Sequence, residues 1–153
     1  MKILCCMIAL SLPILGRSAD APAGPKPAGP KLTRSVAFDW SDLTAEPRPN
    51  GERRDAFNAP TVSLGNFACH ITTLNVGENS GAVITHDVGA LAEKAILIKD
   101  GAVEVTINDT KKTVGSGGVI YFAPGDRTFL RNAGKTSATY FVITVIAASS
   151  AGK

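Results

Sequence analysis

The sequence is poor in cysteine, in aromatic residues and in excess charge of either sign. Its 153 residues include three cysteines, aromatic residues make up 6%, and 16 Lys and Arg against 13 Asp and Glu leave a net charge of +3. Three cysteines are too few for a zinc ribbon or a disulfide framework. A net charge of +3 does not predict a nucleic-acid-binding surface. With 44% hydrophobic and 19% charged residues, the chain is expected to form one globular domain of ordinary size.

The N-terminus carries an apolar stretch at 3–15, which follows Lys2 and precedes several small residues. This order is typical of a secretory signal peptide, and the stretch is too short to span a bilayer. We therefore expect residues 1–18 to be a signal peptide that is cleaved after Ser18. The mature protein is then secreted or periplasmic and has no membrane span. The alternative is an uncleaved membrane anchor.

Two further segments complete the predicted organisation of the chain. Residues 19–31 are rich in proline, glycine, alanine and lysine, which predicts an extended linker. The folded domain is expected over residues 32–153. Cleavage of the signal peptide would leave Cys69 as the one cysteine of the mature chain, and its apolar neighbours favour a small buried side chain over a reactive thiol.

The domain has the pattern of an all-β protein. From Thr61 onward, short runs rich in Val, Ile and Thr are separated by turn residues about every eight to twelve positions. Asp100-Gly101 is expected to form a two-residue hairpin turn, and Asn108-Asp109 turns the chain again. Many short strands at even spacing predict a sandwich or a small barrel. The run at 139–146 lacks alternation, so we expect it to be buried on both faces, with a second subunit of a homodimer on one side.

In the segment 81–132, the spacing of Gly81 and Gly101, and then of Gly117, Gly125 and Asn132, resembles that of two motifs of the cupin family. The fold of this family is a small jelly-roll barrel, the double-stranded β-helix. The first cupin motif, G-x5-H-x-H-x4-E-x6-G, is matched at its two ends by Gly81 and Gly101. The resemblance implies an all-β cupin-type jelly-roll barrel over most of residues 36–146. The second motif, G-x5-P-x-G-x2-H-x3-N, is matched at Gly117, Gly125 and Asn132.

The metal-binding residues of the family are missing on the direct alignment of these motifs. Cupins hold a metal ion with three His and one Glu that point into the barrel, and the four positions here carry Asp87, Gly89, Lys94 and Thr128. Lys94 would place an ammonium group where a carboxylate should meet a cation, and this set does not suit a divalent first-row ion. We therefore expect no metal cofactor and no metal-dependent catalysis, although whether the chain is an enzyme stays open.

One alternative would restore part of a metal site. His86 and Glu93 each lie one residue before a motif position. A one-residue bulge between Glu93 and Gly101 would turn both side chains inward, because one extra residue reverses the facing of a strand. The chain would then be a cupin metalloenzyme of the isomerase or dioxygenase type, with a divalent metal ion and His70 as a supplementary ligand.

The interpretation we favour is a metal-free barrel that binds a small molecule. The resemblance implies a sugar-like or organic-acid ligand, and Lys94, if it points inward, favours an anionic one. A third interpretation is a structural dimerisation module whose interior is packed solid. The candidate ligand-binding residues are Lys94, Thr128, Asp87, His70 and Tyr121.

Overall fold

The computed structural model describes residues 34–81, 84–85 and 92–148. The predicted signal peptide and linker lie outside the described residues, so both stay predictions. His86, Asp87 and Gly89 also lie outside them. Within the described ranges, no helix is long and apolar enough to cross a membrane.

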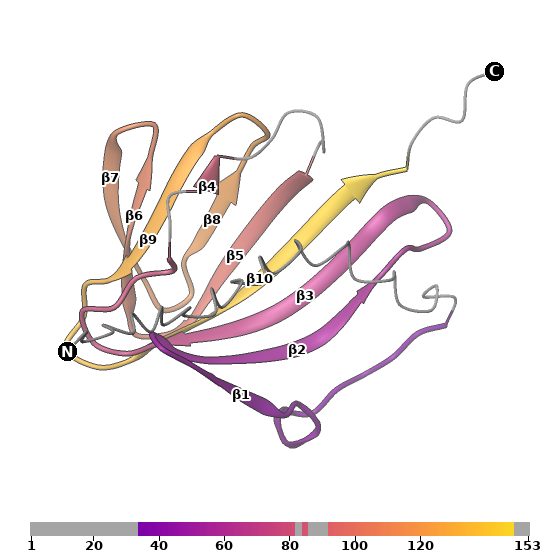
Figure 1. Cartoon of the computed structure of the whole chain (residues 1–153), viewed down its shortest axis with the longest axis horizontal. Coiled ribbons are helices and arrows are strands. Elements are labelled where there is room, and N and C mark those ends of the chain that lie inside the picture. The colour runs from indigo at the N-terminus through magenta and orange to yellow at the C-terminus, as the bar shows by residue number, and fades with distance from the viewer. Residues whose placement is uncertain (1–33, 82–83, 86–91, 149–153) are drawn as a thin grey trace, which may run out of the picture.

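The described chain folds into two antiparallel sheets that face each other (Figure 1). The larger sheet has the order β1-β2-β3-β10-β5-β8 and the smaller one the order β4-β9-β6-β7. Strands from opposite ends of the domain are therefore neighbours, which is the pattern of a jelly roll and confirms the predicted all-β fold. A short 3-10 helix, η1 (Trp40–Asp42), precedes the first strand. The strands are β1 (Ala45–Arg48), β2 (Gly51–Ala59), β3 (Leu64–Leu74), β4 (Ile84–Thr85), β5 (Ala92–Asp100), β6 (Ala102–Ile107), β7 (Thr110–Gly115), β8 (Val119–Phe122), β9 (Arg127–Asn132) and β10 (Ala138–Ala147).

The hairpin expected at Asp100-Gly101 is not formed. The turn instead carries the chain from β5 in the larger sheet to β6 in the smaller one. Gly101 has a φ of +78°, and a Cβ atom there would lie 2.7 Å from the carbonyl oxygen of Ser137, so the corner needs a residue without a side chain. A turn does form at Asp100-Gly101, as the sequence predicts. The turn residues alone, however, do not determine whether the two flanking strands pair with each other. Asn108-Asp109, with positive φ at both residues, does join the paired strands β6 and β7.

The core lies between the two sheets and follows the period-two alternation of the strands. Ile96 and Ile98 on β5 face Val103 and Val105 on β6 from opposite sheets, and all four are at most 3% exposed. The rest of the apolar core comes from Leu74, Ile120, Phe122, Leu130, Ala138, Tyr140 and Val142.

Asn132 closes one end of this core. It is 1% exposed, and its Nδ2 donates hydrogen bonds to the carbonyl oxygens of Leu74, Asn75 and Thr136 at 3.1, 3.0 and 2.9 Å. Its Oδ1 accepts a hydrogen bond from the backbone N–H of Gly134 at 2.9 Å. One buried amide therefore fastens the end of β9 to the loop after β3 and to the turn before β10.

β10 lies in the middle of the larger sheet, between β3 and β5. On its inner face Tyr140 and Val142 are buried, as expected. On its outer face Phe141, Ile143 and Val145 are only half-buried, so the expected burial on both sides is not reached within one chain. The homodimer that would cover this face stays a prediction.

The edge strands of both sheets are short or carry residues that disfavour pairing. In the larger sheet the edges are β1, which contains Pro47, and β8, each with four residues. In the smaller sheet the edges are β4, with two residues, and β7, where Lys111 and Lys112 are exposed.

Candidate functional site

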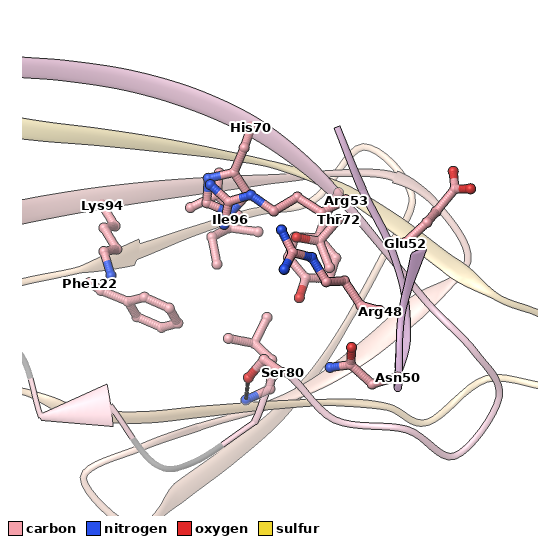
Figure 2. Close-up of a pocket in the computed structure, with 13 residues that line it drawn as sticks. Arg48, Asn50, Glu52, Arg53, His70, Thr72, Ser80, Lys94, Ile96 and Phe122 are labelled. Carbon is pink, nitrogen blue, oxygen red and sulfur yellow. Dashed lines mark hydrogen bonds between the residues drawn. The ribbon is translucent and has the colours of Figure 1, made fainter. Parts of the chain in front are cut away.

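A cavity of about 420 Å³ opens between the two sheets (Figure 2). Its apolar wall is formed by core side chains, among them Ile96, Phe122, Leu130 and Val142. This combination of a preformed apolar wall with a few polar groups is typical of small-molecule sites. The polar groups come from the β1–β2 hairpin, β3 and β5, and include Arg48, Asn50, Arg53, His70, Thr72 and Lys94.

Lys94 reaches the cavity from β5. Its strand neighbours are Phe122 on β8 and Thr144 on β10, and Figure 2 shows its amino group directed toward Phe122 inside the cavity. The side chain is half-buried, and this burial lowers the pKa of the ammonium group from its usual value. Within the described residues, Lys94 makes no ion pair or side-chain hydrogen bond. Lys94 points to the same side of β5 as the buried Ile96 and Ile98.

Glu93 does not enter the cavity, although β5 does contain an irregularity. Thr139 pairs with Asp100 and Tyr140 with Ile98, so β5 bulges between Ile98 and Asp100. This bulge lies beyond Ile98, and the inward alternation from Lys94 to Ile98 is therefore unbroken. Glu93 stays exposed on the outer face, where it forms a side-chain hydrogen bond with Tyr121. The inward shift proposed for Glu93 is wrong, and its partner His86 lies outside the described residues.

His70 lines the cavity from the inner face of β3. The pKa of its imidazole is lowered to about 4, mainly by burial and also by the charges of Arg53 and Lys94, while the charge of Asp55 acts in the opposite direction. Arg53 lines the same cavity and pairs with Asp55 at 2.7 Å. At neutral pH, therefore, His70 is an uncharged imidazole that can accept or donate a hydrogen bond.

Tyr140 adds a phenol to the same wall. It is 2% exposed, and burial raises the pKa of its hydroxyl to about 12, although a hydrogen bond with Thr72 acts in the opposite direction. Both residues line the cavity. At neutral pH the phenol is protonated, so the wall offers hydroxyl groups and no phenolate.

The stability of the fold is expected to depend on pH through His70. Its pKa is about 6.5 when unfolded and about 4 when folded, so between these values the unfolded state binds more protons. The free energy of unfolding should therefore fall as the pH drops from 6.5 to 4. Urea denaturation at several pH values checks this, with His70→Gln as the comparison. The variant should lose part of this slope, and identical slopes for the two proteins would contradict the assignment.

The other candidate residues do not join Lys94 and His70. Thr128 is 1% exposed on β9 and lines a separate depression of about 250 Å³, together with Arg127 and Phe129. Tyr121 is 54% exposed and points away from the cavity, because it alternates on β8 with inward-facing neighbours. Asp87 lies outside the described residues.

Sequence reasoning missed one wall of the cavity altogether. Arg48, Asn50 and Arg53 belong to the β1–β2 hairpin, which precedes the strands expected from Thr61 onward. A signal was present, because Pro49-Asn50-Gly51 is a turn sequence. The flanking residues are mostly charged, however, and do not show the apolar alternation that identifies a strand.

The motif residues that the structure describes do not fit the metal ion that cupins hold. Of the four motif positions, the structure describes the two that carry Lys94 and Thr128, an ammonium group and a hydroxyl group. Neither suits a divalent first-row metal ion. Across the described ranges, no group of three or more His, Cys, Asp or Glu side chains is placed to hold a metal ion.

Comparison with known proteins gives a likeness in structure but not in sequence. No family model and no curated protein matches the chain. The cupin domain of Cnp3 from Schizosaccharomyces pombe is similar with a TM-score of 0.61 and 18% identity, over 74% of this chain and 75% of that one. KdgF from a Halomonas species has a TM-score of 0.63 and 11% identity, over 76% and 97%. An RmlC-like cupin from Shewanella frigidimarina has a TM-score of 0.58 and 14% identity, over 77% and 95%. The two-sheet topology and these neighbours agree with the motif resemblance, and the chain has the cupin jelly-roll fold.

Proposed function

We propose that this protein binds a small organic anion, of the size of a sugar acid or a short carboxylic acid, in the cavity between its two sheets. The observation that carries the proposal is the position of Lys94. Its half-buried amino group lies in the cavity and has no carboxylate partner within the described residues. A buried cation without a counter-charge is unfavourable, and an anionic ligand would remove that cost.

The remaining polar groups support an anion as well. The guanidinium groups of Arg48 and Arg53 line the cavity, and each is held by an exposed acidic neighbour at 2.7 Å. The carboxylate of Glu52 is turned away from the cavity in Figure 2 and pairs with Arg54 at 3.3 Å. The cavity therefore presents more positive than negative charge to a ligand.

The size and the neutral groups of the cavity favour a compact polar ligand. A volume of about 420 Å³ lies in the range of small-molecule pockets. Thr72 and Ser80 offer hydroxyl groups and Asn50 an amide, while Ile96 and Phe122 form an apolar wall. A sugar acid or hydroxy acid has both the charge and the hydroxyl groups that such a lining would bind.

Exchange of Lys94 for methionine tests the proposal. Methionine keeps the length of the side chain and removes its charge, so the fold should persist while a charge-assisted hydrogen bond is lost. Such a bond contributes about 1.5–3 kcal/mol, which predicts at least a tenfold weaker affinity. Isothermal titration calorimetry with galacturonate, gluconate, citrate and pyruvate, against galactose as the neutral comparison, measures it.

Lys112→Met is the matched control, because Lys112 is exposed on β7 and lies outside this cavity. It should leave affinity unchanged. Equal binding of acids and neutral sugars would overturn the proposal, as would an acid bound equally well by wild type and Lys94→Met.

The other two interpretations receive less support. The metalloenzyme needs Glu93 inside the barrel, and Glu93 is on the outer face. The structural module needs a solid interior, and the structure has a cavity between the sheets.

A further inference from the structure

Lys94 differs from every other cation of the cavity in its surroundings. Arg48 pairs with Glu46, and Arg53 pairs with Asp55, each at 2.7 Å. The amino group of Lys94, by contrast, is directed toward Phe122 (Figure 2) and has no ion pair with any described residue. Glu93, its acidic neighbour in sequence, faces the opposite side of the sheet.

This environment favours the neutral, nucleophilic form of an amine. Burial lowers the pKa of Lys94, and no carboxylate within the described residues stabilises the ammonium form. Nucleophilic lysines are activated in the same way, by desolvation and by neighbouring positive charge.

A group that can move protons lies on the same inner face. His70 on β3 and Lys94 on β5 are separated by the single strand β10, which corresponds to about 10 Å between the strand axes. Both side chains line the cavity, and their proximity is sufficient for the charge of Lys94 to lower the pKa of His70. The neutral imidazole can therefore accept a proton from a bound ligand or from the lysine, directly or through water.

We propose that Lys94 forms a reversible imine with an acid that also carries an aldehyde or ketone, such as a 2-oxo acid or an open-chain uronic acid. The inference rests on the proposed function, because the ligand first binds in this cavity as an anion. When its carbonyl group then reacts with Lys94, its carboxylate is held by Arg48 and Arg53, which line the same cavity. Arg48 and Arg53 reach the cavity from the hairpin, whereas Lys94 reaches it from β5 (Figure 2).

The reaction needs no reagent beyond the protein, the ligand and water. The lone pair of the neutral Nζ forms a bond to the carbonyl carbon, and the π electrons of the C=O bond move to oxygen, which takes up a proton. The nitrogen loses a proton to water, which the neutral imidazole of His70 can orient by a hydrogen bond. The hydroxyl group then takes up a second proton and leaves as water while the nitrogen lone pair forms the C=N bond. The product at this point is the protonated imine. Loss of the second proton of the nitrogen to water then gives the neutral imine, so the sum is amine plus carbonyl compound giving imine plus water.

Reductive trapping tests the inference. The purified protein is incubated with sodium cyanoborohydride and, in separate samples, with pyruvate, glyoxylate or galacturonate, and the modified lysines are mapped by peptide mass spectrometry. At least one of the three probes should label Lys94 ten times more than the exposed Lys112. If none of them does so, the inference is overturned.

Lys94→Arg separates imine formation from anion binding. Arginine keeps a positive charge in the cavity but cannot form an imine under these conditions, so the variant should lose trapping. Its affinity for lactate or gluconate, which carry no ketone, reports anion binding alone. Wild-type protein that binds these hydroxy acids but is not labelled at Lys94 would overturn the imine and leave the proposed function standing. Loss of hydroxy-acid binding in Lys94→Met but not in Lys94→Arg would confirm the anion site independently.

Discussion

Replacement of Asn132 by alanine is expected to lower the free energy of unfolding by about 3–5 kcal/mol. The side chain is 1% exposed, and its amide donates to the carbonyl oxygens of Leu74, Asn75 and Thr136. Alanine would leave the three carbonyl oxygens without a hydrogen-bond donor at a buried position. It would also leave a small cavity where the amide group was. Urea denaturation followed by circular dichroism measures the change.

Two further variants test whether the lost hydrogen bonds are the cause of the lower free energy of unfolding. Asn132→Asp keeps the size of the side chain and its acceptor for the N–H of Gly134, but it replaces the donor by a charged oxygen that faces three carbonyl oxygens. It should be at least as unstable as the alanine variant. Asn75→Ala, at an exposed side chain on the same loop, should change stability by less than about 0.5 kcal/mol. An alanine variant at 132 that is as stable as Asn75→Ala would show that the three hydrogen bonds contribute nothing.

Gly51→Ala is expected to cost about 3 kcal/mol or more, or to detach the β1–β2 hairpin from the rest of the larger sheet. Gly51 has a φ of +149°, and a Cβ atom there would lie 1.9 Å from the carbonyl oxygen of Thr73. Neither backbone segment can move away easily, because Gly51 pairs with Leu74 on the adjacent strand. Denaturation and ligand titration measure the two consequences.

Gly77→Ala provides a matched control for the backbone strain alone. Gly77 also has a positive φ, of +77°, but nothing lies within 4 Å of a Cβ placed there. Its alanine variant should cost only about 1 kcal/mol, which is the usual penalty of a left-handed conformation. Because Arg48, Asn50 and Arg53 line the cavity from this hairpin, Gly51→Ala should also weaken anion binding, whereas Gly77→Ala should not. Equal stability of the two variants would contradict the steric argument.

The sequence predicted the strands that follow an apolar alternation and the inward direction of Lys94. The position of Lys94 in the cupin motif gave that direction. A simple count back from Gly101 would not, because β5 bulges between Ile98 and Asp100. Local reasoning failed at Asp100-Gly101, because a turn sequence does not say whether the next strand pairs with the previous one or crosses to the other sheet. That choice depends on β8, β9 and β10, which lie further along the chain.

The arginine side of the site could not be predicted from periodicity. β2 carries Arg53 and Arg54 at positions that are half-buried in the fold, and a charged strand of this kind has no apolar signature. Thr128 shows the opposite case. The cupin motif placed it in the barrel, and it is indeed buried on β9, but it borders a different depression from the one that holds Lys94. The motif therefore predicts where a residue lies on its strand, but it does not predict which cavity the side chain will line.

The outer edges of the two sheets have a consequence for self-association. Pro47 lacks the N–H that an added strand would need, Lys111 and Lys112 would bring charge against any incoming backbone, and the strands β4 and β8 are two and four residues long. Each of these features blocks the open-ended stacking of chains that leads to fibrils. Edge-to-edge addition of further strands is therefore disfavoured at each of these described edges.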